Sequence, residues 1–168
     1  MKRRNFLVLG SLLGLSPYIE GKETSSFERS FKKVEETIAS VQVHMFPANT
    51  KLPSAVQMKT IVFLFDTVNH SSYDRDIRAF VIEGAEELIT REKGKFVQMS
   101  AAEKEKALRA YEKTSYGSNW LSRIMTLTME GLFSDPIYGS NVNEAVWKAL
   151  GAYGGVPRAQ KRYISDEV

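Results

Sequence analysis

Few side chains in this sequence could do chemistry, and the histidines are the scarcest of them. The 168 residues include two histidines, His44 and His70, and no cysteine. A metal site built on three histidines is therefore impossible. A site that used carboxylates would need a neighbouring aspartate beside His70: Asp66, Asp74 or Asp76. The alternative, which we favour, is that His44 lies at a helix C-terminus, where a cation is stabilised, and that His70 lies in a polar turn.

The lack of cysteine removes several kinds of site from this chain. It excludes disulfides, thiolate metal ligands, iron–sulfur clusters, covalently attached c-type haem and a lipoprotein anchor. We therefore expect no metal and no cofactor to be bound by this chain.

Acidic and glycine-rich stretches also fail to form a recognisable catalytic motif. Two acidic pairs, at 35–36 and 86–87, are adjacent in sequence. Neighbours on a helix point about 100° apart, so neither pair forms a carboxylate dyad. The glycines from Gly151 to Gly155 have neither the preceding strand nor the spacing of a phosphate-binding loop. The sequence predicts no catalytic residue.

Helical periodicity dominates the chain, which predicts one all-α bundle over residues 23–168. We expect five main helices and a short C-terminal one. The first shows an apolar stripe at spacings of three and four, formed by Phe27, Phe31, Val34, Ile38 and Val41. Ser25 and Glu28 are suited to a capping box at its start, and Pro47 ends it.

The second and third helices are predicted from shorter patterns. The second should begin near Ser54, with a buried face of Met58, Ile61, Val62, Phe65 and Val68. A strand is the competing assignment for residues 62–65, which are all apolar. The third should run from Tyr73 to Glu92, and Gly84 within it suggests that another backbone packs closely there.

Clearer signals mark the fourth and fifth helices. Ser100 and Glu103 predict a capping box that opens a helix ending near Lys113. Residues 116–119 are expected to form a turn. The fifth helix then carries an apolar face of Trp120, Leu121, Ile124, Met125, Thr128 and Leu132.

Residues 133–151 are predicted to form an ordered loop and a short helix. Asp135 and Pro136 start a turn, and Gly139 can supply a positive φ. Asn141 should cap the next helix, with Glu144 as its capping-box partner. The inward-facing residues of that helix are expected to be Val142, Val146, Trp147 and Leu150, and Gly151 is suited to the C′ position.

Two interpretations of this loop remain open. It is either a structural turn or a surface that docks a partner, and the two are compatible. The residues concerned are Phe133, Asp135, Pro136, Tyr138, Gly139, Asn141 and Trp147.

The N-terminus has the pattern of a bacterial twin-arginine export signal. Arg3 and Arg4 precede Phe6 and Leu7, and an apolar stretch runs to Leu15. This stretch is too short to span a membrane, so residues 1–22 are predicted to be a signal or a shallow anchor. They also carry the whole net charge of +3, since the rest of the chain has equal numbers of acidic and basic residues. Nucleic-acid binding therefore lacks electrostatic support.

The segment from Glu130 to Gly151 resembles the gluconate 2-dehydrogenase subunit 3 family. Members of that family end a long helix in a Glu-Gly-Phe-Phe-like run, followed by an Asp-Pro-x-Tyr-Gly-Gly-Asn-like loop and a tryptophan. The residues that match are Glu130, Gly131, Phe133, Asp135, Pro136, Tyr138, Gly139, Asn141, Trp147 and Gly151. Ser140 departs from the pattern, since glycine is usual there.

The resemblance implies a small accessory subunit without an active site of its own. Its partners would be a large subunit that holds FAD and, indirectly, a cytochrome c-type subunit that holds haem. The small subunit would provide the export signal read by the twin-arginine translocon, and the complex would lie in the periplasm at the inner membrane. The alternative is an independent periplasmic helical binding protein.

Overall fold

The computed structural model describes residues 26–48 and 50–162. Within these ranges every regular element is helical, as predicted, with five longer α-helices and one short one. The α-helices are α2 (Ser26–Met45), α3 (Thr60–Asn69), α4 (Arg75–Arg91), α5 (Ala101–Glu112), α6 (Ser115–Phe133) and α7 (Ala145–Ala149). Short 3-10 helices are η1 (Phe96–Gln98), η2 (Pro136–Tyr138) and η3 (Val142–Glu144). The predicted export signal and Ser25 lie outside the described residues.

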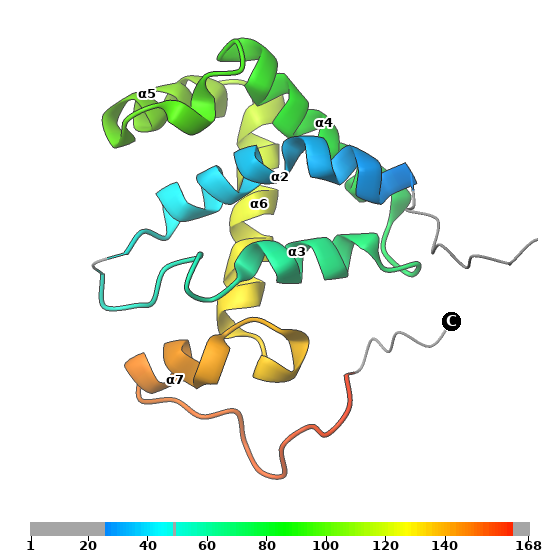
Figure 1. The fold of residues 1–168 in the computed structure, drawn as a ribbon, viewed down its shortest axis with the longest axis vertical. Coiled ribbons are helices and arrows are strands. Elements are labelled where there is room, and N and C mark those ends of the chain that lie inside the picture. The colour runs from blue at the N-terminus through cyan, green and yellow to red at the C-terminus, as the bar shows by residue number, and fades with distance from the viewer. Residues whose placement is uncertain (1–25, 49, 163–168) are drawn as a thin grey trace, which may run out of the picture.

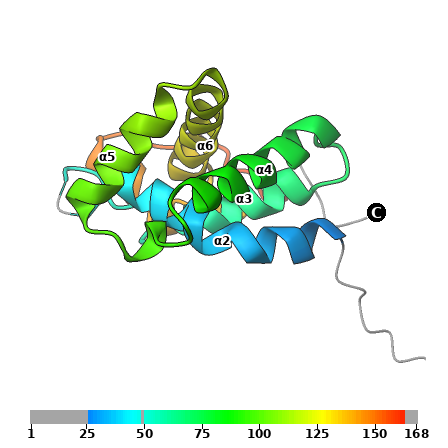
Figure 2. The same ribbon diagram turned by 90° about the horizontal axis from the view of Figure 1, so that it is seen from above.

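Helix α6 is the central element of the bundle. It packs against α2, α3, α4, α5 and α7. In Figure 1, α2 and α3 cross in front of α6, and α7 lies below its lower end. Seen from above in Figure 2, α6 lies between α5 and α4, and α2 runs along one edge of the molecule. The exposed residues of α6, such as Ser122, Met125 and Met129, mark the outward side of this helix.

The main core lies between α6 and the helices that surround it. The predicted stripe of α2 is buried from Phe27 to Val41, and Trp120 and Tyr111 are fully buried. The Trp120 indole N–H donates to the Val81 carbonyl over 3.1 Å, and the Tyr111 hydroxyl donates to the Gly84 carbonyl over 3.0 Å. These bonds satisfy the polar atoms of both aromatic residues and tie α5 and α6 to α4.

Gly84 makes room for a side chain rather than for another backbone. A Cβ added at Gly84 would collide with the Trp120 indole ring. The expected close approach is therefore present, but its partner is an aromatic ring of α6.

Helices α5 and α6 each begin directly after a residue whose side chain caps the helix. The predicted capping box is confirmed, since the Glu103 N–H donates to Ser100 Oγ and the Ser100 N–H donates to Glu103 Oε2. Helix α6 starts earlier than expected, at Ser115, because Thr114 Oγ1 accepts from the Gly117 N–H over 3.0 Å. The predicted turn at 116–119 is therefore wrong.

The second predicted helix starts later than Ser54. Residues 55–59 form turns that end at Lys59, whose φ of +54° interrupts the helix, and α3 begins at Thr60. Its fully buried residues include Leu64 and Val68, whereas Val62 is 43% exposed. The prediction that Val62 is buried is wrong because α3 turns a different face to the core. The helix prediction itself is confirmed over the competing strand.

Candidate functional site

The loop after α6 is organised by a short polar turn. Asp135 Oδ1 accepts from the Ile137 N–H over 3.0 Å, and Pro136 occupies the first turn of η2. Gly139 has a φ of +82°, in the left-handed region that favours glycine. The predicted roles of Asp135, Pro136 and Gly139 are thus confirmed as turn chemistry.

Two buried polar residues fasten the loop to its surroundings. Ser140 Oγ donates to the Met58 carbonyl over 2.6 Å, which joins the loop to the turn before α3. Asn141 donates through Nδ2 to the Ser134 carbonyl and accepts the Val146 N–H at Oδ1, each over 3.0 Å. Both side chains are therefore used inside the protein.

Asn141 caps α7, but not in the predicted way. Its φ is +46°, and Asn143 and Glu144 also have positive φ, so the α-helix begins only at Ala145. Asn141 Oδ1 consequently reaches Val146 within α7, and the predicted capping box with Glu144 does not form. Gly151 has a φ of +66° beyond the helix end, as predicted for C′.

Trp147 closes the loop against the end of α6. Its indole N–H donates to the Phe133 carbonyl over 3.0 Å. Gly154 lies so close that an added Cβ would collide with the Trp147 ring. Leu150, by contrast, is 55% exposed, which corrects the prediction that it faces inward. Helix α7 is five residues long and buries only Val146. Leu150 follows the end of this helix and is not packed against the core.

Sequence reasoning missed two residues of this site: Arg162, whose Nε donates to the Ile137 carbonyl over 2.8 Å, and Arg158. The Arg158 guanidinium lies 3.0 Å from Asp135 Oδ2, 2.8 Å from Glu144 Oε1, and 4.8 Å from the Trp147 ring centroid. One cation thus joins the turn, the start of α7 and the tryptophan. The signal available in the sequence was the basic tail with Arg158, Lys161 and Arg162, which follows Asp135 and Glu144.

Several charged and titratable side chains of these helices and loops form structural contacts. Arg158 pairs with both Asp135 and Glu144. Glu105 lies 2.7 Å from His44 Nε2 and 2.9 Å from Arg109 Nε. His70 Nδ1 lies 2.7 Å from Ser72 Oγ in a turn, as the structural interpretation predicts. Burial raises the pKa of the Tyr111 phenol, so it stays protonated and donates to Gly84. Over residues 26–48 and 50–162, no group of three potential ligands is placed to hold a metal ion.

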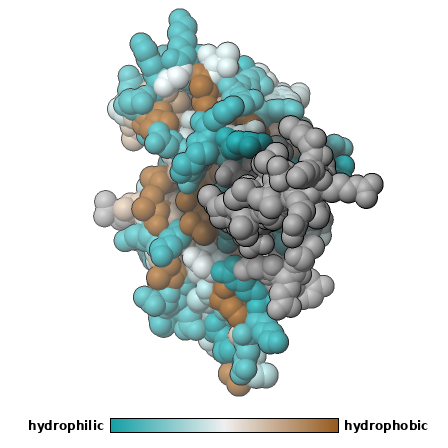
Figure 3. Space-filling view, turned by 45° about the vertical axis from the view of Figure 1, so that its right-hand side comes forward, coloured by the Kyte–Doolittle hydropathy of each residue, from teal (hydrophilic) through white to brown (hydrophobic). Residues whose placement is uncertain are grey.

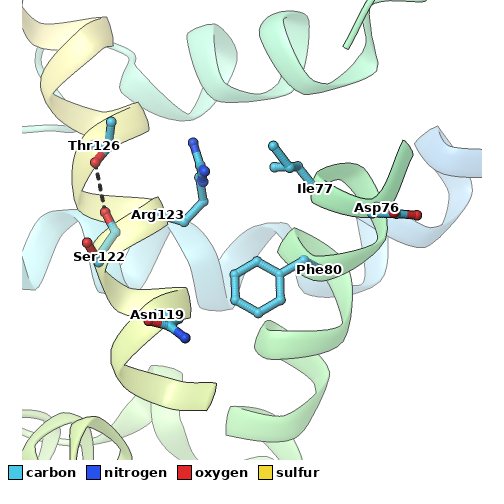
Figure 4. A pocket seen from close by; sticks show the side chains of 7 residues that line it. All are labelled: Asp76, Ile77, Phe80, Asn119, Ser122, Arg123 and Thr126. Carbon is cyan, nitrogen blue, oxygen red and sulfur yellow. Dashed lines mark hydrogen bonds between the residues drawn. The ribbon is translucent and has the colours of Figure 1, made fainter. Parts of the chain in front are cut away.

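Two clefts flank the outward side of α6. The α4–α6 cleft, of about 600 Å³, is lined by Asp76, Ile77, Phe80, Asn119, Ser122, Arg123 and Thr126. Figure 4 shows Phe80 and Arg123 extending into the space between the two helices, while the Asp76 carboxylate points away from α6. The second, the α2–α5–α6 cleft, has a volume of about 580 Å³, and its lining includes Phe46, Leu108, Leu121, Ser122 and Met125. Met125 is itself 43% exposed, which corrects the prediction that it is buried.

The other predicted residues divide into two groups. Phe133 is 37% exposed, and Pro136 and Tyr138 are half-buried, so the docking interpretation of the loop stays a prediction. Arg3, Arg4, Phe6 and Leu7 lie outside the described residues. No described helix has the length and apolar character needed to cross a membrane.

Comparison with known proteins supports one family. The model of gluconate 2-dehydrogenase subunit 3 matches residues 32–155, which include α3 to α7 and most of α2. Neither the curated proteins nor the solved structures contain a match to the chain. The matched range covers most of the chain and includes the whole Glu130–Gly151 motif. The chain therefore belongs to the gluconate 2-dehydrogenase subunit 3 family.

Proposed function

We propose that this chain is the non-catalytic small subunit of a periplasmic, flavin-dependent, gluconate-type dehydrogenase. In this proposal it escorts the FAD-bearing large subunit through twin-arginine export and stabilises it after assembly. The observation that carries the proposal is the family match over residues 32–155, because the family is a subunit of a dehydrogenase and implies association with a larger subunit.

The chemistry of the described residues supports a non-catalytic role. The carboxylates of the motif take part in a turn and in ion pairs with Arg158. The sequence contains no cysteine, and its two histidines lie in separate structural contacts. FAD and haem would accordingly belong to the large subunit and to a cytochrome c-type subunit.

The export role rests on the sequence of the N-terminus. Arg3, Arg4, Phe6 and Leu7 match a signal for the pathway that carries folded proteins. A large subunit that binds FAD before transport would need such a route. The complex would then lie in the periplasm, held at the inner membrane through its other subunits or an uncleaved signal.

Purification of the native complex tests this proposal. The full chain, tagged at its C-terminus, is isolated from its own host in mild detergent, and the visible spectrum and dye-linked dehydrogenase activity are measured. We expect the purified complex to show a flavin spectrum and dehydrogenase activity. After this chain is separated from its partners, the isolated chain should show neither. Flavin, haem or activity that remains with the isolated chain would contradict the non-catalytic role. Recovery of the chain without any flavoprotein would instead favour the independent binding protein.

A further inference from the structure

The outward side of α6 differs from an ordinary solvated helix face. Six exposed residues along it carry no charge, namely Ser118, Ser122, Met125, Thr126, Met129 and Phe133, and the exposed Glu130 borders them beside Thr126. We call the six uncharged residues the α6 ridge. Exposed positions of α5, by comparison, include Glu105, Arg109 and Glu112. Solvated helix faces normally carry charges of this kind, so the α6 ridge lacks the usual adaptation to water.

Large apolar side chains are concentrated along the lower part of the ridge. Met125 is 43% exposed, Met129 42% and Phe133 37%, on successive turns of one helix. Methionine and aromatic residues are enriched at the centres of protein interfaces, while most charged residues are depleted there. The ridge from Ser118 to Phe133 extends over about 22 Å at the ordinary rise of an α-helix.

The ridge stands between the two clefts described above. Ser122 lines both of them, Thr126 lines the α4–α6 cleft, and Met125 lines the α2–α5–α6 cleft. The cleft linings also contain charged residues, Arg123 on one flank and Arg109 on the other. An uncharged ridge with hollows on both sides and charges at their linings has the composition of an interface centre with a polar rim.

Other large apolar residues are more exposed than the ridge, but they lie in the turn before α3 and at or beyond the end of α7: Val56, Leu150, Tyr153 and Val156. Val62 on α3 is as exposed as Met125, but Asp66, one turn along, is also exposed. On the face drawn in Figure 3, brown apolar patches are separated by hydrophilic residues. Val62 therefore provides a control position of the same exposure on a different helix.

We infer that the α6 ridge is the surface that docks the larger dehydrogenase subunit. This inference rests on the proposed function, because family membership is what identifies a larger subunit as the partner. The surface of that subunit should be apolar and uncharged where it meets Met129, with raised flanks that enter the two clefts. Phe133 ends the ridge and begins the loop, so docking here is continuous with the motif that characterises the family.

Photo-crosslinking in the intact complex tests the surface without disturbing the core. Benzoylphenylalanine is placed in the full chain at position 126, 129, 62 or 138, and crosslinked products from the native host are identified by mass spectrometry. We expect positions 126 and 129 to crosslink to the flavin-bearing large subunit and position 62 to give no such product. Crosslinks to that subunit only from 62 or 138 would overturn the inference. So would crosslinks from 129 to a second copy of the chain or to its own residues 1–25.

A pair of matched substitutions provides the energetic test. Met129→Glu should lower recovery of the flavoprotein by about tenfold or more, because it places a charge at the interface centre. Val62→Glu should leave recovery unchanged, and circular dichroism should show equal helix content in both variants. Full recovery of the flavoprotein with Met129→Glu, together with crosslinks elsewhere, would contradict docking at the α6 ridge but leave the proposed function intact. Absence of any flavoprotein with the unaltered chain would contradict both the docking inference and the proposed function.

Discussion

Arg158 joins three parts of the segment that follows α6. It pairs with Asp135 and Glu144, and its guanidinium lies over Trp147. Partly exposed ion pairs usually contribute up to about 1 kcal/mol each, and a cation–π contact contributes a similar amount. The combination should hold the loop and α7 in a single arrangement.

We expect Arg158→Gln to loosen this segment by about 1–2 kcal/mol without unfolding the bundle. Hydrogen exchange measured by mass spectrometry should show backbone amides of residues 135–149 exchanging about tenfold faster, with α2 and α4 unchanged. The control is Lys161→Gln, at an exposed position of the same tail. Equal exchange in the two variants would show that the segment is held by its other contacts.

Gly84 decides how closely α4 approaches Trp120. Alanine in a helix is normally favoured over glycine by about 1 kcal/mol, but overpacking usually removes about 1–3 kcal/mol. Because the added Cβ would collide with the buried indole ring, we expect Gly84→Ala to lower the free energy of unfolding by about 2 kcal/mol, measured by urea denaturation.

Gly131→Ala is the graded control for this prediction. Its added Cβ would lie 3.2 Å from Phe63 Cδ1, a side chain that is only partly buried and can shift. We expect a smaller loss of stability for Gly131→Ala than for Gly84→Ala. A Gly84→Ala protein as stable as the parent would mean that α4 and α6 can separate there without loss.

At the scale of elements, α2 and α5 are tied by the contact between His44 and Glu105. The hydrogen bond with His44, and then the one with Arg109, hold the pKa of Glu105 below its ordinary value of 4.5. The unfolded chain therefore takes up this proton first as the pH falls. The stabilisation is present above the ordinary pKa and is lost as the pH falls through the lowered one.

Glu105→Gln should consequently lower the melting temperature at neutral pH, and the difference from the parent should vanish in acid. Melting temperatures measured between pH 7 and pH 3 check this. Glu86→Gln, which removes an exposed carboxylate from α4, is the control for a general charge effect. A Glu105→Gln difference that persists unchanged at pH 3 would contradict the stated cause.

The elements that sequence patterns predict well are those governed by local contacts. The buried stripe of α2, the Ser100 capping box and the positive φ of Gly139 depend on residues close in the chain, and all three are confirmed. The turn at 116–119 was wrong because the Thr114 cap outweighed the local preference of these polar residues. A side chain that accepts hydrogen bonds from the first amides of a helix can therefore override a local preference for a turn.

Long-range contacts account for most of what sequence patterns missed. Arg158 meets Asp135 only because the tail returns over α7. Helical periodicity placed Val62 and Met125 on apolar faces but could not tell which side of α3 or α6 the other helices cover. The α6 ridge was hidden for the same reason, since its methionines look like core residues in the sequence.

At the scale of the whole molecule, the chain is a helical domain of a family that implies association with a larger subunit. The described helices pack around α6 and leave an exposed ridge of six uncharged residues on that helix, bordered by Glu130. The family identifies a larger dehydrogenase subunit as the partner, and the N-terminal arginines predict an export route for folded proteins. Together these features support the proposal that the chain binds, stabilises and delivers the larger subunit.

The location of the large subunit in cells that lack this chain tests the central claim most directly. Periplasmic and cytoplasmic fractions of the deletion strain are assayed for the flavin-bearing subunit by immunoblot and for electron transfer to the respiratory chain. Complementation uses either the parent chain or the Arg3→Lys, Arg4→Lys double variant. We predict that the large subunit stays in the cytoplasm in the deletion strain and with the double variant, and returns to the periplasm with the parent chain. A large subunit that is exported and fully active without this chain would contradict the account.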